Sequence, residues 1–116
     1  MIKYHSVNSK TIAELLTDTL SITNSDEILD LMAEVGSHNC ENLIIHARSL
    51  HPDFFDLKSG LAGEILQKFS NYRMRLSIIG DFSGIKSKSL KDFIRESNRR
   101  GIISFVPSLK EALAHF

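Results

Sequence analysis

Short apolar segments separated by polar, glycine-containing turns predict alternating strands and helices along the chain. Residues 3–7 and 11–16 are two strand candidates, and residues 8–10 form a plausible hairpin turn between them. A first helix is then predicted by apolar residues at helical spacing and a glycine at the end of the pattern: Ile28, Leu31, Met32, Val35 and Gly36. The chain is therefore expected to open with a β-hairpin and an amphipathic helix.

The remaining pattern alternates regularly between strand and helix. Residues 43–47, 75–80 and 102–106 are short, apolar and rich in β-branched residues, as buried strands are. Ser108 and Glu111 have the spacing of a capping box at the start of a terminal helix. The apolar stripes of three further helices are Leu61, Ile65, Leu66 and Phe69; Leu90, Phe93 and Ile94; and Leu109, Ala112, Leu113 and Phe116. The predicted order is ββαβαβαβα.

This order predicts an α/β fold with a mixed sheet of four or five strands. Strands that are joined through helices are parallel neighbours, so the helices must cover the sheet. Ligand-facing surface is expected where the parallel strands end. The loops at residues 46–59, 80–89 and 106–108 are expected to meet at that edge.

The composition is that of one ordinary globular domain. A chain of 116 residues with 42% hydrophobic residues can bury a single core, so residues 1–116 are expected to form one domain. Cys40 is the only cysteine, which excludes an internal disulfide and a metal site built on several thiolates. The first residues do not resemble a signal peptide, and no apolar run is long enough to cross a membrane. We therefore expect a cytoplasmic protein with no membrane partner.

The net charge of zero conceals two halves of opposite sign. Residues 1–56 carry 3 basic and 9 acidic side chains, whereas residues 57–116 carry 11 basic and 5 acidic ones. The densest basic segment runs from Lys86 to Arg100 and is interrupted by Asp92 and Glu96. Nucleic-acid binding through this segment is one alternative, but no aromatic residues interleave for base stacking. A solvated helix face explains the segment more simply.

A predicted turn into the second helix, at residues 56–63, is the most informative local feature. Ser59 can cap the helix, and Gly60 allows the backbone to bend or another surface to approach. The N–H groups that begin a helix favour negative charge. An anion, a partner carboxylate or a phosphate attached to Ser59 would therefore be stabilised there.

The element order, together with the sequence Ser59-Gly60-Leu61 at a helix start, resembles the STAS family, the anti-sigma-factor antagonist fold. In that family a serine at the start of the second helix is phosphorylated and switches partner binding. Lys58 stands at the position of that serine in this chain. Residues 54–106 resemble a bacterial STAS-like family of small domains of unknown function, through residues 62–69, 80–83, 92–94 and 96–98. This resemblance implies a STAS-like fold and no known activity.

Two residues could carry chemistry at the expected ligand edge. His46 ends an apolar strand and is the best general-base candidate, although a hydrogen-bonded core histidine is the simpler interpretation. Asp81 follows the next apolar strand and could bind a cation, although a loop-capping aspartate is the simpler interpretation. The other histidines lack the spacing of a metal site, and no phosphate-binding or dinucleotide fingerprint is present. We therefore assign no catalytic residue, metal or cofactor.

The sequence thus favours a regulatory or protein-binding module that acts without catalysis. The expected contact surface is the start of the second helix with the neighbouring strand-end loops, and its residues are Lys58, Ser59, Gly60, Asp81, Ser83 and Lys86. The two lysines would supply positive charge, Ser59 a hydroxyl or modification site, and Asp81 an opposing carboxylate. A small enzyme or ligand carrier using His46 and Asp81 is the main alternative, and homo-oligomer formation stays open.

Overall fold

The computed structural model describes residues 1–17 and 19–116 and has one mixed sheet with four α-helices. The five strands follow one another across the sheet in chain order. In chain order the strands and helices are β1 Ile2–Val7, β2 Lys10–Leu15, α1 Ser25–Gly36, β3 Asn42–His46, α2 Leu61–Asn71, β4 Arg75–Ile79, α3 Lys88–Arg100, β5 Ile103–Val106 and α4 Leu109–His115. Three short 3₁₀ segments connect β3 to α2: η1 Ala47–Ser49, η2 Pro52–Phe55 and η3 Leu57–Ser59. The predicted α/β class and element order are confirmed, with strand ends shifted by at most one residue.

The sheet consists of an antiparallel hairpin joined to a parallel sheet. β1 pairs antiparallel with β2, and β2, β3, β4 and β5 pair in parallel. The hairpin turns at Asn8 and Ser9, whose φ angles are both positive, at 53° and 67°. Two such residues give a turn whose twist matches that of the flanking strands. The hairpin makes β1 an edge strand.

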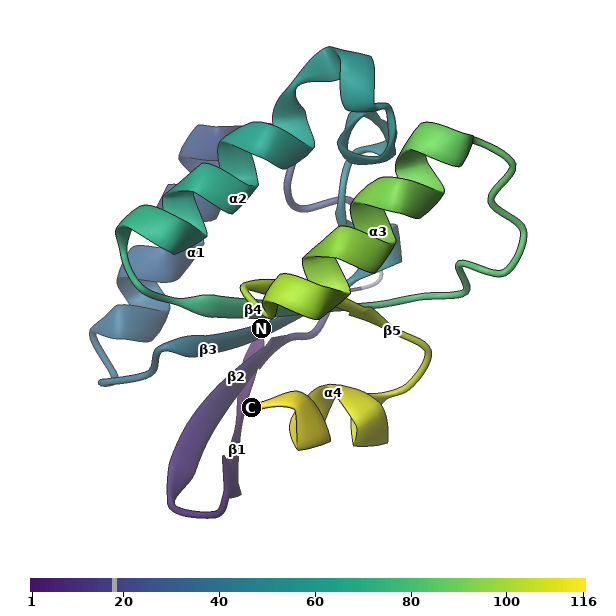
Figure 1. Ribbon diagram of the computed structural model, residues 1–116. Coiled ribbons are helices and arrows are strands. Elements are labelled where there is room, and N and C mark those ends of the chain that lie inside the picture. The colour runs from purple at the N-terminus through teal and green to yellow at the C-terminus, as the bar shows by residue number, and fades with distance from the viewer. Residues whose placement is uncertain (18) are drawn as a thin grey trace.

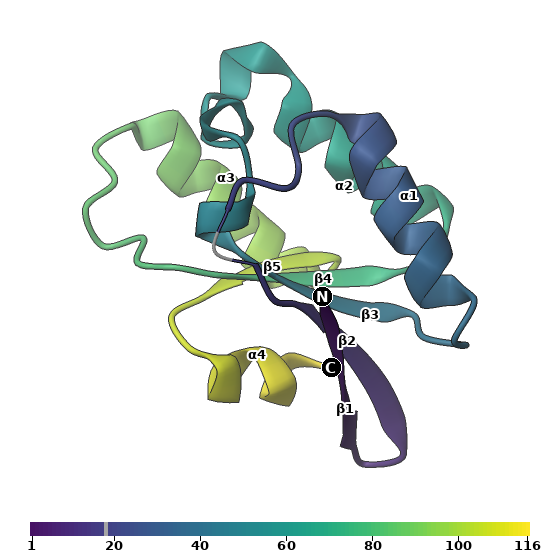
Figure 2. The ribbon, with the colours of Figure 1, turned by 180° about the vertical axis from the view of Figure 1, so that it is seen from behind.

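The two faces of the sheet are covered unequally. Figure 1 shows α1, α2 and α3 on one face and the short α4 on the other, and the reverse view in Figure 2 shows the same arrangement. Parallel strands that follow in chain order, with right-handed crossovers, place all their connecting helices on the same side. Of the helices in the described residues, only α4, which follows the last strand, packs on the opposite face.

Side chains at the helix starts explain where three of the helices begin. Asn24, Ser87 and Ser108 each accept a hydrogen bond from a backbone N–H in the first turn of the helix that follows. These bonds satisfy donors that a helix leaves without an internal partner. The cap predicted at Ser108 is confirmed by its bond from the Glu111 N–H.

The main core lies between the sheet and the three-helix layer. Phe54, Ile65 and Phe69 are fully buried there, so the predicted apolar stripe of α2 faces the sheet. A smaller cluster under α4 contains Ile12, Ile44, Ile79 and Ala112. Among the described residues, no helix combines the length and apolarity that a bilayer span requires.

Candidate functional site

The start of α2 is an exposed and tightly bonded turn. The Ser59 hydroxyl donates to the carbonyl oxygen of Asp53 at 2.5 Å and accepts from the N–H of Leu61 at 3.2 Å. Gly60 has a φ of +81°, in the left-handed region that favours glycine. Gly60, rather than Ser59, is the N-cap residue, so the predicted cap was one residue too early. Ser59 nevertheless bonds the first helical N–H.

The β4–α3 loop supplies the second part of the predicted surface. One carboxylate oxygen of Asp81 accepts hydrogen bonds from both the backbone N–H and the hydroxyl of Ser83, at 3.0 and 2.6 Å. The side-chain bond and then the backbone bond from Ser83 lower the pKa of Asp81. A β-carbon at Gly80 would lie 2.9 Å from the Cβ of Ala47, so glycine permits this close approach. Asp81 is therefore the loop-capping aspartate that the sequence favoured.

Aromatic packing joins this loop to the segment that precedes α2. Phe55 in η2 and Phe82 in the loop have ring centroids 6.2 Å apart. Phe82 also packs edge-on against Phe105 of β5, at 5.3 Å, and Phe54 lies 6.1 Å from the same ring. Edge-on and tilted ring pairs at these separations are favourable. The aromatic contacts thus hold η2 and the β4–α3 loop together at the edge of the sheet where the parallel strands end.

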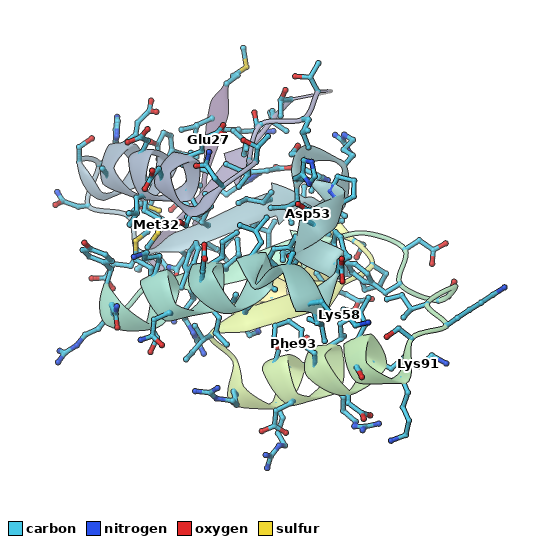
Figure 3. All side chains as sticks on the ribbon, turned by 90° about the horizontal axis from the view of Figure 1, so that it is seen from above. Glu27, Met32, Asp53, Lys58, Lys91 and Phe93 are labelled. Carbon is cyan, nitrogen blue, oxygen red and sulfur yellow. The ribbon has the colours of Figure 1, made fainter. Side chains whose placement is uncertain are left out.

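We call the six predicted residues Lys58, Ser59, Gly60, Asp81, Ser83 and Lys86 the α2-start surface, and all six are exposed. Figure 3 shows Lys58 on the same side of the molecule as Lys91 near the start of α3. Within residues 1–17 and 19–116, neither Lys58 nor Lys86 forms an ion pair. The structure thus places the predicted residues on two adjoining segments.

The basic helix α3 neutralises part of its own charge. Lys88 and Arg95 both pair with Asp92, at 3.4 and 2.5 Å. Arg99 pairs with Glu96 at 2.6 Å. Exposed pairs of this kind contribute little to stability, but they reduce the positive field that a nucleic acid would meet. The arrangement agrees with a solvated helix face.

A second cluster, of His5, Glu14 and His46, lies on the sheet face that α4 covers. The Nε2 atom of His46 donates to one Glu14 oxygen at 2.7 Å, and the Nε2 atom of His5 donates to the other at 2.8 Å. The Glu14 side chain is only 5% exposed, whereas those of His5 and His46 are 14% and 16% exposed. One buried carboxylate therefore holds two partly exposed imidazoles.

The register of three neighbouring strands produces this cluster. Lys3 of β1 and Ile44 of β3 lie opposite Glu14 of β2. His5 and His46 each lie two residues beyond those partners along their own strands, so they are diagonal neighbours of Glu14 on the same face. The cluster ties the edge hairpin to the parallel part of the sheet.

Hydrogen bonds keep the buried carboxylate charged. Burial alone would raise the pKa of Glu14, and it is the largest single influence on that group. The hydrogen bonds from His46 and His5, with the charge attraction of both imidazoles, outweigh burial and lower the pKa of Glu14 below 4.5. An ionised Glu14 can only accept hydrogen bonds, which makes each imidazole a donor through Nε2. A neutral imidazole in that state presents Nδ1 as an acceptor.

Sequence reasoning identified His46 but missed its partners. His46 is the hydrogen-bonded histidine that the sequence favoured, yet its carboxylate is Glu14, whereas Asp81 bonds to Ser83. A glutamate between apolar residues of a strand was the available signal, because such a carboxylate is seldom buried without a partner. Across the part of the chain that the structure describes, no group of three histidine, cysteine or acidic side chains has the geometry to hold a metal ion.

Residues 7–116 match the family described as a domain of unknown function, DUF4180. This chain belongs to the DUF4180 family. The match begins at the end of β1 and includes both the α2-start surface and the Glu14–His46 pair. Comparisons with curated proteins and with solved structures gave no match.

Proposed function

We propose that this DUF4180 domain is a non-catalytic regulatory module of STAS-like type that binds a protein partner through the α2-start surface. The observation that carries the proposal is the aromatic contact between Phe55 and Phe82, which holds two exposed polar segments together. Binding residues are often carried by loops that a rigid scaffold positions. The STAS-like assignment rests on the element order and on the exposed Ser59 at the helix start.

The charges of this surface favour an acidic contact on the partner. Lys58 and Lys86 supply two exposed cations, and the first turn of α2 adds the positive end of the helix dipole. Phosphate on Ser59 would introduce about −1.5 to −2 charges at neutral pH and would compete with such a contact. Modification of Ser59 would therefore act on the partner contact directly, without requiring a change of fold.

Site-specific photo-crosslinking tests this proposal in cells. A photoreactive amino acid is placed at Lys58 and, as a control, at Lys110, which is exposed on α4 across the sheet. The proposal predicts one protein that crosslinks from position 58 only and is lost when Ser59→Asp is added. The same crosslinked proteins from both positions would contradict it. Crosslinked nucleic acid at position 58 would instead favour the α3 alternative.

A further inference from the structure

A groove lies at the edge of the sheet where the parallel strands begin, away from the α2-start surface. An inference about this groove does not depend on the proposed function. The groove lies beside the second half of α1 and the two turns that lead into β3 and β4. Its volume is about 630 Å³, within the range of small-molecule sites. Figure 3 shows Met32 between α1 and α2, where it forms part of the groove wall. We propose that this groove binds a small organic cation, an amine carried on an apolar body.

The inner part of the groove is apolar and the outer part carries an exposed aromatic ring. Met32 and Met74 line the groove and are 4% and 8% exposed, respectively. Methionine side chains adapt readily to different apolar ligands. Tyr72 lines the groove as well, yet 63% of this residue is exposed, which is high for a large ring. An apolar ligand body that covers the ring would remove that surface from water.

The charged groups of the lining are all acidic. Asp30 from α1 and Glu41 before β3 both line the groove and are exposed, and the lining contains no lysine or arginine. The groove also receives the carboxyl end of α1, whose last turn contains no basic residue. A helix carboxyl end carries partial negative charge and favours a cation. The Tyr72 ring face can add a cation–π contribution.

These features select one class of ligand over its neutral and anionic analogues. Two carboxylates, a helix carboxyl end and an aromatic face all favour positive charge, while the methionines and Leu29 favour an apolar body. The carboxylates are exposed, so their attraction is screened and the affinity should fall as salt rises. Apolar contact supplies the rest of the binding energy.

A matched set of probes tests the proposal by two-dimensional NMR titration of the full chain. The probes are 4-phenylbutylamine, 4-phenylbutanol and 4-phenylbutyrate, which share an apolar body and differ in charge. We expect the amine to shift backbone resonances around Gly36, Asn39 and Tyr72. The alcohol should bind about fivefold more weakly or worse, as the loss of two exposed ion contacts implies, and the carboxylate weaker still.

Paired variants separate the groove from general charge effects. Asp30→Asn with Glu41→Gln should weaken amine binding about fivefold, whereas Asp26→Asn with Glu27→Gln, in the first turn of α1, should leave it unchanged. Tyr72→Phe should keep the affinity and Tyr72→Ala should lower it. The proposal would be overturned if the amine and the alcohol bound equally, or if the two charge variants had equal effects. It would also be overturned if the amine shifted resonances away from the groove. The absence of shifts at millimolar amine would overturn it too.

Discussion

The Nε2 atom of His46 donates a hydrogen bond to the buried carboxylate of Glu14 across two neighbouring parallel strands, at 2.7 Å. His5 occupies the second oxygen of the same carboxylate from the antiparallel side. Glu14 thus links the two kinds of strand pairing in this sheet through side chains. It is the one buried acidic residue within residues 1–17 and 19–116. Its replacement should therefore affect both histidines at once.

Glu14→Gln should change the tautomer of one histidine and destabilise the fold. The amide oxygen can still accept from one imidazole, but the amide N–H₂ group meets the other Nε2–H as a second donor. That imidazole must move its proton to Nδ1 or lose its partner. We expect a loss of about 1.5–3 kcal/mol in the free energy of unfolding. Nitrogen NMR of the imidazoles should show two Nε2–H tautomers in the wild type and a mixed pair in the variant.

The stabilisation by Glu14 should depend on acidity. The folded-state pKa of Glu14 lies below its ordinary value of 4.5. As the pH falls, the Glu14 carboxylate therefore takes up a proton at a higher pH in the unfolded chain than in the folded chain. The contribution is present above pH 4.5 and is lost as the pH falls through the folded value. Denaturant unfolding of wild type and Glu14→Gln should show a stability difference near neutrality that shrinks as the pH falls below 4.5. A constant difference across this range would assign the effect to packing rather than charge.

Two neighbouring buried serines should respond differently to alanine. Ser77 and Ser104 lie opposite each other on β4 and β5 and are 0% and 3% exposed. Ser104 hydrogen-bonds His115 at 2.6 Å, whereas Ser77 has no hydrogen-bond partner among the described residues. Ser104→Ala should therefore cost about 1 kcal/mol, while Ser77→Ala should be neutral or stabilising. An equal loss from both substitutions would show that Ser77 has a partner in solution.

The packing of α2 should dominate the stability of the helix layer. Phe69 is fully buried against the sheet, and Phe69→Ala is expected to cost about 3–5 kcal/mol in chemical denaturation. Tyr72, one turn further along and 63% exposed, provides a matched aromatic control. Tyr72→Ala should change the unfolding free energy by less than about 0.5 kcal/mol. Losses of similar size would contradict the assigned helix face.

Local sequence patterns predicted most of this fold. The apolar stripe of α2 and the strand from Arg75 to Ile79 could be recognised, because the spacing of apolar residues and the glycines beside them reflect local secondary structure. The exposed α2-start residues could also be chosen, because loops after parallel strands meet at one edge. The partners of His46 could not be predicted, because strand register decides which side chains meet. Three separate strands contribute to the cluster of His5, Glu14 and His46. The groove near Tyr72 was missed because α1 and two turns that are distant in the sequence come together to line it.

The central claim is that the α2-start surface binds the partner, and affinity for the crosslinked protein tests it most directly. Dissociation constants would be measured for wild type, Lys58→Glu, Ser59→Asp and the opposite-face control Lys110→Glu, with circular dichroism to verify folding. We expect Lys58→Glu to weaken binding about tenfold and Ser59→Asp to weaken it by a similar factor, while Lys110→Glu binds like wild type. Wild-type affinity in both Lys58→Glu and Ser59→Asp would contradict the account and direct attention to the basic face of α3.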